Sequence, residues 1–157
     1  MENLSLSSNI AKLWNTHQQR ENLYKQTMTL DDLGPLRKLC SQGYMVSLLF
    51  KKEINWIYDQ IKCTLSEGDI SKGIANYNLP NLVISSDNQM LVTKMLLEQE
   101  DKTIKLYKSL LSERDITYDA KLILIEHLEK LNDIYLFLKR EVSKSQVKLP
   151  VMIQAVA

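Results

Sequence analysis

Three glutamates interrupt the apolar patterns of the chain, and their type and spacing suit metal or acid–base chemistry. Glu21, Glu53 and Glu100 lie in stripes of mainly apolar residues that recur every three or four positions, so a helix would place them on its packed face. An ionised carboxylate is costly to bury unless it is paired, protonated or bound to a metal ion. The three positions are therefore candidates for metal ligands or for partners in buried ion pairs.

The two histidines of the chain are the other candidate ligands. His17 lies one turn before Glu21, and His127 lies beside the apolar stripe of its own predicted helix. Helical bundles that hold two metal ions use a Glu from each of two helices and a Glu-x-x-His motif from each of the other two. Neither histidine here has a Glu three residues earlier. Glu21, Glu53, Glu100 and His127 therefore form an incomplete version of that ligand set.

Two interpretations of these candidates remain open. In the first, the carboxylates pair with Arg20, with tyrosine hydroxyls or with water, or lie at the stripe edges, and the protein has no cofactor. In the second, they bind iron or manganese in a degenerate site in which His127 supplies the imidazole. The missing Glu-x-x-His motifs favour the first interpretation.

Other catalytic patterns are missing from the sequence. No Ser, Thr or Cys has a histidine at a spacing that indicates a nucleophile–base pair, and there is no Gly-rich phosphate loop. We therefore expect a non-enzymatic protein with no catalytic or cofactor-binding residues.

The composition is that of an ordinary globular domain. The 157 residues are 45% hydrophobic and 25% charged, with 20 Lys and Arg against 19 Asp and Glu. A net charge of +1 gives no support for nucleic-acid binding, and no apolar run approaches the ~18–20 residues that span a bilayer. Cys40 and Cys63 are too far apart along one predicted helix to pair. We expect a cytoplasmic protein without a signal peptide.

Glycine and proline divide the chain into four predicted helices. The 69 residues from 81 to 149 contain neither residue, so helices can continue there for many turns. The predicted domain comprises residues 1–146, followed by an apolar C-terminal tail at 147–157. Apolar periodicity places the four helices from about Ser5–Ser8 to Met28, from Leu33 to Ser66, from Ser86 to Ser112, and from Asp115–Thr117 to about Lys144.

The connections determine how these helices pair. Short links make the first two helices, and the last two, antiparallel neighbours. The segment Glu67–Ser85 is long enough to run along the bundle, so the second and third helices can be parallel, as in ferritin-like folds. Ser86 with Gln89 indicates a capping box for the third helix, and Gly43 marks either a close approach of two helices or a weak point. We predict an all-α, ferritin-like four-helix bundle with a long crossover that self-associates.

Short motifs on three of the predicted helices resemble a known family. They are Arg20-x-x-x-Tyr24, Ser47-x-x-Phe50-x-x-Glu53-Ile54, and Glu100-Asp101 followed by Tyr107; the fourth helix is similar in its Leu131 and Leu138 spacing. Over about residues 4–142, the chain resembles a bacterial family of ferritin-like proteins of unknown function, related in fold to rubrerythrins. The resemblance implies a four-helix bundle linked to stress response or metal handling.

Overall fold

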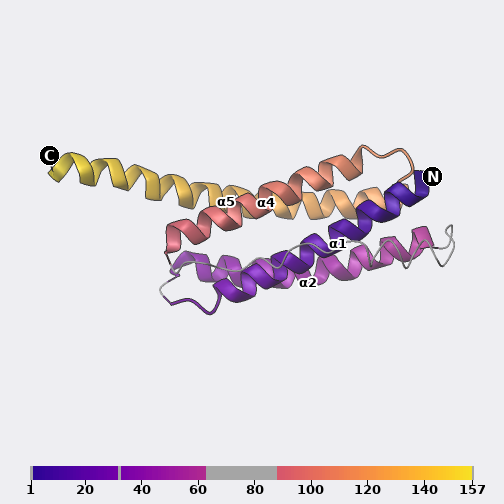
Figure 1. Cartoon of the computed structure of the whole chain (residues 1–157), viewed down its shortest axis with the longest axis horizontal. Coiled ribbons are helices and arrows are strands. Elements are labelled where there is room, and N and C mark those ends of the chain that lie inside the picture. Colours follow the sequence, from indigo (N-terminus) through magenta and orange to yellow (C-terminus); the bar gives the residue numbers. More distant parts are fainter. Residues whose placement is uncertain (1, 32, 63–87, 157) are drawn as a thin grey trace.

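The protein is an all-α four-helix bundle, as the sequence predicts. A computed structural model describes residues 2–31, 33–62 and 88–156, and these ranges contain helices and turns but no strand. No helix within them is long and apolar enough to cross a membrane. The helices are α1 (Glu2–Thr27), α2 (Pro35–Lys62), α4 (Gln89–Leu111) and α5 (Tyr118–Val156), as shown in Figure 1.

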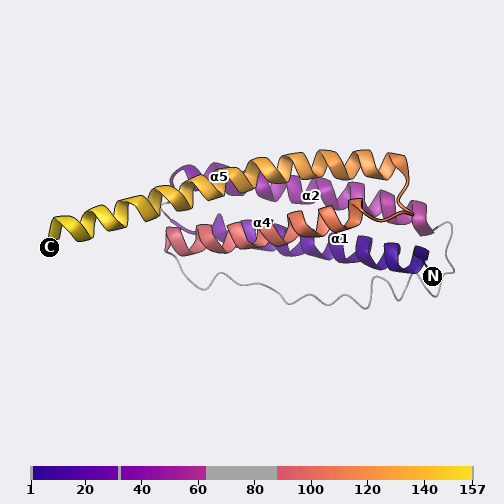
Figure 2. The ribbon, with the colours of Figure 1, turned by 90° about the horizontal axis from the view of Figure 1, so that it is seen from above.

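The four helices surround one core. Helix α1 packs mainly against α2 and α4, and α5 packs against the same two helices. Helices α2 and α4 run in the same direction, opposite to α1 and α5 (Figures 1 and 2). The segment Glu67–Ser85, which we expected to form the crossover, lies outside the described residues.

The close approach of α1 and α2 depends on Gly43. A Cβ atom at this position would lie 2.6 Å from Cζ of the Tyr24 ring. The sequence left open whether Gly43 marks a contact between helices or a weak point, and the contact is confirmed. Before α2 begins at Pro35, Gly34 turns the chain with a φ of 57°, a conformation that favours glycine.

Side-chain caps start the last two helices. The carboxamide of Asn88 accepts hydrogen bonds from the backbone N–H groups of Met90 and Leu91. The capping box predicted at Ser86 is therefore wrong: Asn88, an equally favourable cap, begins the helix two residues later. The Thr117 hydroxyl accepts from the backbone N–H of Ala120, which confirms Thr117 among the predicted caps of α5.

Helix α5 is longer than the sequence predicts. We expected it to end near Lys144, but it continues past Pro150 to Val156. The cations from Lys139 to Lys144 suit a helix end, but a dipole interaction of about 0.3–1 kcal/mol does not impose one. Residues 147–156, expected as a tail, therefore belong to α5 and extend past the other three helices (Figures 1 and 2).

Two apolar clusters form the core, one toward each end of the bundle. The first includes Leu13, Ile54 and Leu124, and the second includes Leu23, Leu36 and Leu96. On α1, the first cluster ends at Leu13 and the second begins at Leu23, and the residues between them are largely polar. The core is therefore interrupted halfway along its length by polar side chains.

Candidate functional site

A layer of buried polar side chains crosses the middle of the bundle and connects all four helices. Each member is at most 1% exposed. We call this group the polar layer, and its members are His17, Arg20 and Tyr24 on α1, Ser47 on α2, Glu100 and Tyr107 on α4, and His127 on α5.

An ion pair between α1 and α4 lies at the centre of the polar layer. Arg20 Nε donates to Glu100 Oε1 at 2.7 Å, and the Tyr24 hydroxyl donates to the same oxygen at 2.9 Å. Burial, the largest single influence, would lower the pKa of Arg20, but the charge and hydrogen bond of Glu100, together with Tyr24 and Tyr107, outweigh it and the pKa is raised. Burial, reinforced by Glu100, also raises the pKa of Tyr24 well above its usual value. Arg20 and Glu100 therefore form a charged pair, and Tyr24 is a neutral donor.

Arg20 also forms hydrogen bonds to α2 and to a second residue of α1. Arg20 Nη1 donates to Ser47 Oγ at 3.1 Å and contacts His17 Nδ1 at 2.9 Å. Because a guanidinium only donates, His17 Nδ1 must accept, and the proton of the neutral imidazole is on Nε2. Burial, followed by the charge of Arg20, lowers the pKa of His17 well below its usual value, which agrees with this neutral form.

The Tyr107 hydroxyl joins the two histidines. It lies 2.7 Å from His17 Nε2 and 2.8 Å from His127 Nδ1. Since His17 Nε2 donates to this oxygen, the hydroxyl proton is directed to His127 Nδ1, which leaves the His127 proton on Nε2. Burial is the main cause that lowers the pKa of His127, to about 3. The hydrogen bonds thus have one direction, from Arg20 through His17 and Tyr107 to His127.

Glu53 lies where this chain of hydrogen bonds reaches the edge of the bundle. His127 Nε2 is 3.4 Å from Glu53 Oε1, close enough for attraction but without hydrogen-bond geometry. The Glu53 side chain is 34% exposed. The His127 ring stacks on Phe50 at 3.7 Å between centroids, and the Lys130 ammonium lies 6.0 Å from the Phe50 ring.

Glu21 is held outside the polar layer. Its carboxylate pairs with the Lys51 ammonium of α2, which also donates to Gln18 Oε1 at 2.7 Å. Both charged side chains are 16% exposed, so Glu21 lies at the edge of the apolar stripe rather than in its centre.

The four predicted ligands therefore do not converge on one point. Glu53 and His127 come together, but Lys51 pairs with Glu21 and Arg20 pairs with Glu100. In the part of the chain that the structure describes, no group of three or more His, Cys, Asp or Glu could hold a metal ion. These residues do not fit a two-metal centre, because each of two carboxylates already contacts a cation.

The sequence identified some members of the polar layer but not their connection. Pairing of a glutamate with Arg20 and a tyrosine hydroxyl, one of the two open interpretations, describes Glu100. Ser47 entered the sequence analysis only through the family motif; its hydroxyl donates to the Gly43 carbonyl of its own helix and accepts from Arg20 Nη1. The bridge from His17 through Tyr107 to His127 joins positions far apart in the sequence, so spacing carried no signal for it.

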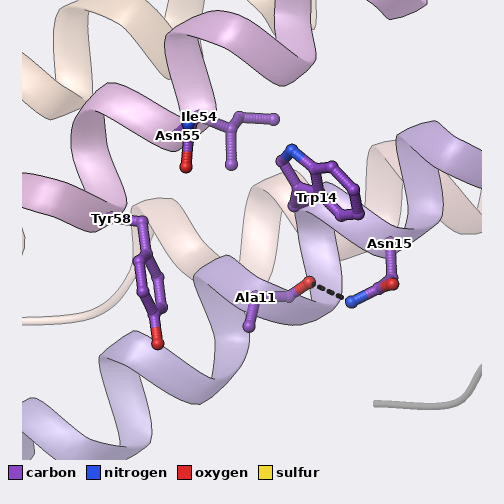
Figure 3. Close-up of a pocket in the computed structure, with 6 residues that line it drawn as sticks. All are labelled: Ala11, Trp14, Asn15, Ile54, Asn55 and Tyr58. Atoms are coloured by element: carbon purple, nitrogen blue, oxygen red, sulfur yellow. Dashed lines mark hydrogen bonds between the residues drawn. The ribbon is translucent and has the colours of Figure 1, made fainter. Parts of the chain in front are cut away.

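A small cavity lies between α1 and α2. Its volume is about 130 Å³, and the aromatic rings of Trp14 and Tyr58 lie on its two sides (Figure 3). The Asn15 amide donates to the Ala11 carbonyl at 2.9 Å, so that donor is used within its own helix. The residues that line the cavity are Ala11, Trp14, Asn15, Ile54, Asn55 and Tyr58.

Large apolar side chains also remain on the outer surface of the bundle. Tyr118 is the most exposed, at 74%, and Met45 follows at 61%. The others are between 42% and 51% exposed. They belong to α2, α4 and α5, and they are Leu49, Trp56, Leu91, Leu122, Ile125 and Leu136.

Comparisons of this chain with protein-family models, with curated proteins and with solved structures gave no match.

Proposed function

We propose that this protein is a non-enzymatic helical bundle that acts through contacts with other protein chains, either its own copies or a partner. The observation that carries the proposal is the group of large apolar side chains on the outside of α2 and α5. Exposed apolar groups that lie together on one side of a helix are typical of surfaces that another chain covers.

The polar layer supports a structural role for the buried chemistry. All of its residues are at most 1% exposed, so a substrate would reach them only if the helices separated. The Arg20 and Glu100 charges neutralise each other across α1 and α4. Such a network favours one arrangement of the four helices, because a shifted helix would leave a buried charge unpaired.

The proposal includes ferritin-like topology with a crossover between α2 and α4. Helices α2 and α4 run in the same direction, which supports a link that returns along the bundle. The motifs shared with the ferritin-like family would connect the protein to stress response, with assembly rather than redox chemistry as its contribution.

Site-specific photo-cross-linking in the native cells tests the role in protein contacts. A benzophenone amino acid replaces Leu122 on α5 or Trp56 on α2, both exposed and apolar. It also replaces Lys102, an exposed residue of α4, as a control. We expect discrete adducts of higher mass from Leu122 or Trp56 and none from Lys102. Absence of adducts from both apolar positions would refute the proposal.

The alternative function is binding of iron or manganese, and the contact between Glu53 and His127 is the observation that favours it. Arg20 next to Glu100 and Lys51 next to Glu21 oppose it, because a nearby cation weakens a carboxylate as a metal ligand. Metal analysis of protein purified without chelator decides between the two. Stoichiometric metal that Glu53→Gln removes would favour metal binding, and metal that does not respond to Glu53→Gln or Glu100→Gln would exclude it.

A further inference from the structure

Two rows of exposed residues border the seam between α2 and α5. Glu53 is the α2 residue that contacts His127 of α5. Leu49 lies four positions before Glu53 and Trp56 three positions after it, so both lie next to it on the outer side of the helix. They are 46% and 44% exposed. We call these two residues, together with Met45 one turn earlier, the apolar row.

The α5 side of the seam carries acidic residues before and after one lysine. Lys130 is the α5 residue whose ammonium lies over Phe50 of α2. Glu126 lies four positions before Lys130 and Asp133 three positions after it, so both lie on the same face of α5 as Lys130. Asp119 precedes Glu126 by two helical turns. We call Asp119, Glu126 and Asp133 the acidic row.

The acidic row has no ion-pair partner among the described residues. Its three residues are exposed, and none forms an ion pair with another residue in the described ranges. Lys52 of α2, between Leu49 and Trp56, is likewise exposed and outside these ion pairs. Within the described helices, this face thus carries a cation beside apolar side chains on α2 and acids on α5, none of them in an ion pair with another described residue.

Lys52 and Glu126 lie at matching heights along the bundle. The stacked rings of Phe50 and His127 set a common level for the two antiparallel helices. Lys52 is two residues beyond Phe50, and Glu126 is one residue before His127, which places them about 3 Å and 1.5 Å from that level in the same direction.

The same reasoning pairs the apolar residues of this face. Trp56 is six residues beyond Phe50, and Leu122 is five residues before His127. Their heights are therefore about 9 Å and 7.5 Å from the common level, again in the same direction. Leu122 is 45% exposed and lies one turn before Glu126.

We propose that a second copy of this chain covers the α2–α5 face, related by a two-fold axis parallel to the helices. Such an axis preserves height and places α2 of each copy against α5 of the other. Lys52 then meets Glu126 of the second copy, and Trp56 meets Leu122 of the second copy. Each contact occurs twice.

Charge selects this arrangement over the other two-fold pairing of the same face. An axis perpendicular to the helices would place α2 against α2 and α5 against α5. In that pairing Lys52 would lie against α2 of the second copy and away from Glu126, so these opposite charges would not meet. In the proposed pairing, every contact between Lys52 and Glu126 joins opposite charges.

This inference rests on the proposed function, because it names which protein contact the bundle makes. Sedimentation velocity of the full chain over a wide concentration range tests it with charge reversals. The wild-type chain is expected to form a dimer of about 36 kDa, twice its 18.2 kDa. Lys52→Glu or Glu126→Lys alone should raise the dissociation constant of the dimer about tenfold or more. The double variant Lys52→Glu/Glu126→Lys should return it to near the wild-type value.

Lys102→Glu on α4 is the matched control, because it makes the same change of charge on another helix and should leave the dimer unchanged. Thermal unfolding followed by circular dichroism confirms that each variant is folded. A wild-type monomer at every concentration would overturn the dimer. If neither single reversal changes the dissociation constant, or if the double variant does not restore it, the contact lies on another face. The proposed function would then remain intact.

Discussion

The ring of Tyr24 occupies the space that a side chain at position 43 would need. A Cβ atom built on Gly43 would lie 2.6 to 2.8 Å from three carbon atoms of that ring. The ring has little freedom to move, because it is buried and its hydroxyl donates to Glu100 Oε1. Helices α1 and α2 can thus approach this closely because position 43 has no side chain.

Gly43→Ala is therefore expected to destabilise the protein by about 1–3 kcal/mol through overpacking. We expect this loss even though alanine by itself stabilises a helix interior by about 1 kcal/mol relative to glycine. Urea unfolding measures the difference. In a Tyr24→Leu background the cost of Gly43→Ala should shrink, since the ring is gone. Equal or greater stability of Gly43→Ala in the wild-type background would show that α1 and α2 do not approach this closely.

Breaking the buried ion pair should be the most damaging change of charge in the molecule. Glu100→Gln leaves the Arg20 guanidinium buried without a counter-charge, at a cost of about 3–5 kcal/mol. The double variant Arg20→Met/Glu100→Gln should cost less than the sum of the two single variants, because no uncompensated charge remains.

A double-mutant cycle from urea unfolding measures that coupling. The exposed pair between Lys105 and Asp101 is the control, and Asp101→Asn should change stability by no more than about 0.5 kcal/mol. Additive effects of the Arg20 and Glu100 substitutions would contradict a direct pair.

Stability should fall as the pH is lowered below about 6.5. In the folded protein the pKa of His127 is about 3, and that of His17 is also well below its usual value. Below 6.5 the unfolded chain therefore binds protons that the folded chain does not. Each histidine contributes up to about 1.4 kcal/mol of lost stability per pH unit, and its stabilisation is fully present only above 6.5.

Urea unfolding at several pH values from 8 down to 4 would record this loss. His127→Asn keeps an acceptor for Tyr107 but does not titrate. The free energy of unfolding of this variant should therefore fall less steeply as the pH is lowered, because only one buried histidine remains. A wild-type stability that does not change between pH 7 and pH 5 would show that the histidines are not buried as neutral groups.

Arg20 should determine the protonated nitrogen of His17 directly, and that of His127 through the Tyr107 hydroxyl. Nitrogen-15 NMR is expected to find both His17 and His127 neutral and protonated on Nε2, the direction that Arg20 imposes. Tyr107→Phe would leave buried groups of both rings unpaired and destabilise the protein by about 1–3 kcal/mol. Tyr135→Phe, at a half-buried tyrosine of α5, should have a much smaller effect. A proton on Nδ1 of His17 would contradict the assigned direction.

Apolar periodicity and charges at helix ends predicted part of the site and of the fold, and their limits explain the errors. The predicted carboxylates do lie in or beside the packed stripes, but periodicity cannot separate a buried position from one at the edge. Glu100 is fully buried, whereas Glu21 is partly exposed next to Lys51, and the difference comes from the neighbouring helix. The end of α5 was predicted too early for a related reason, since favourable charges at a helix end are too weak to stop it.

The sequence by itself determined the four helices, their apolar faces and the presence of polar groups on those faces. These features depend on interactions between residues three or four positions apart, so a short stretch of sequence is enough to predict them. Only the tertiary structure decided that Arg20 neutralises Glu100, that Tyr107 bridges two histidines and that Glu21 has a separate partner. Each of these contacts joins different helices, so the rotation and height of one helix against another decide them.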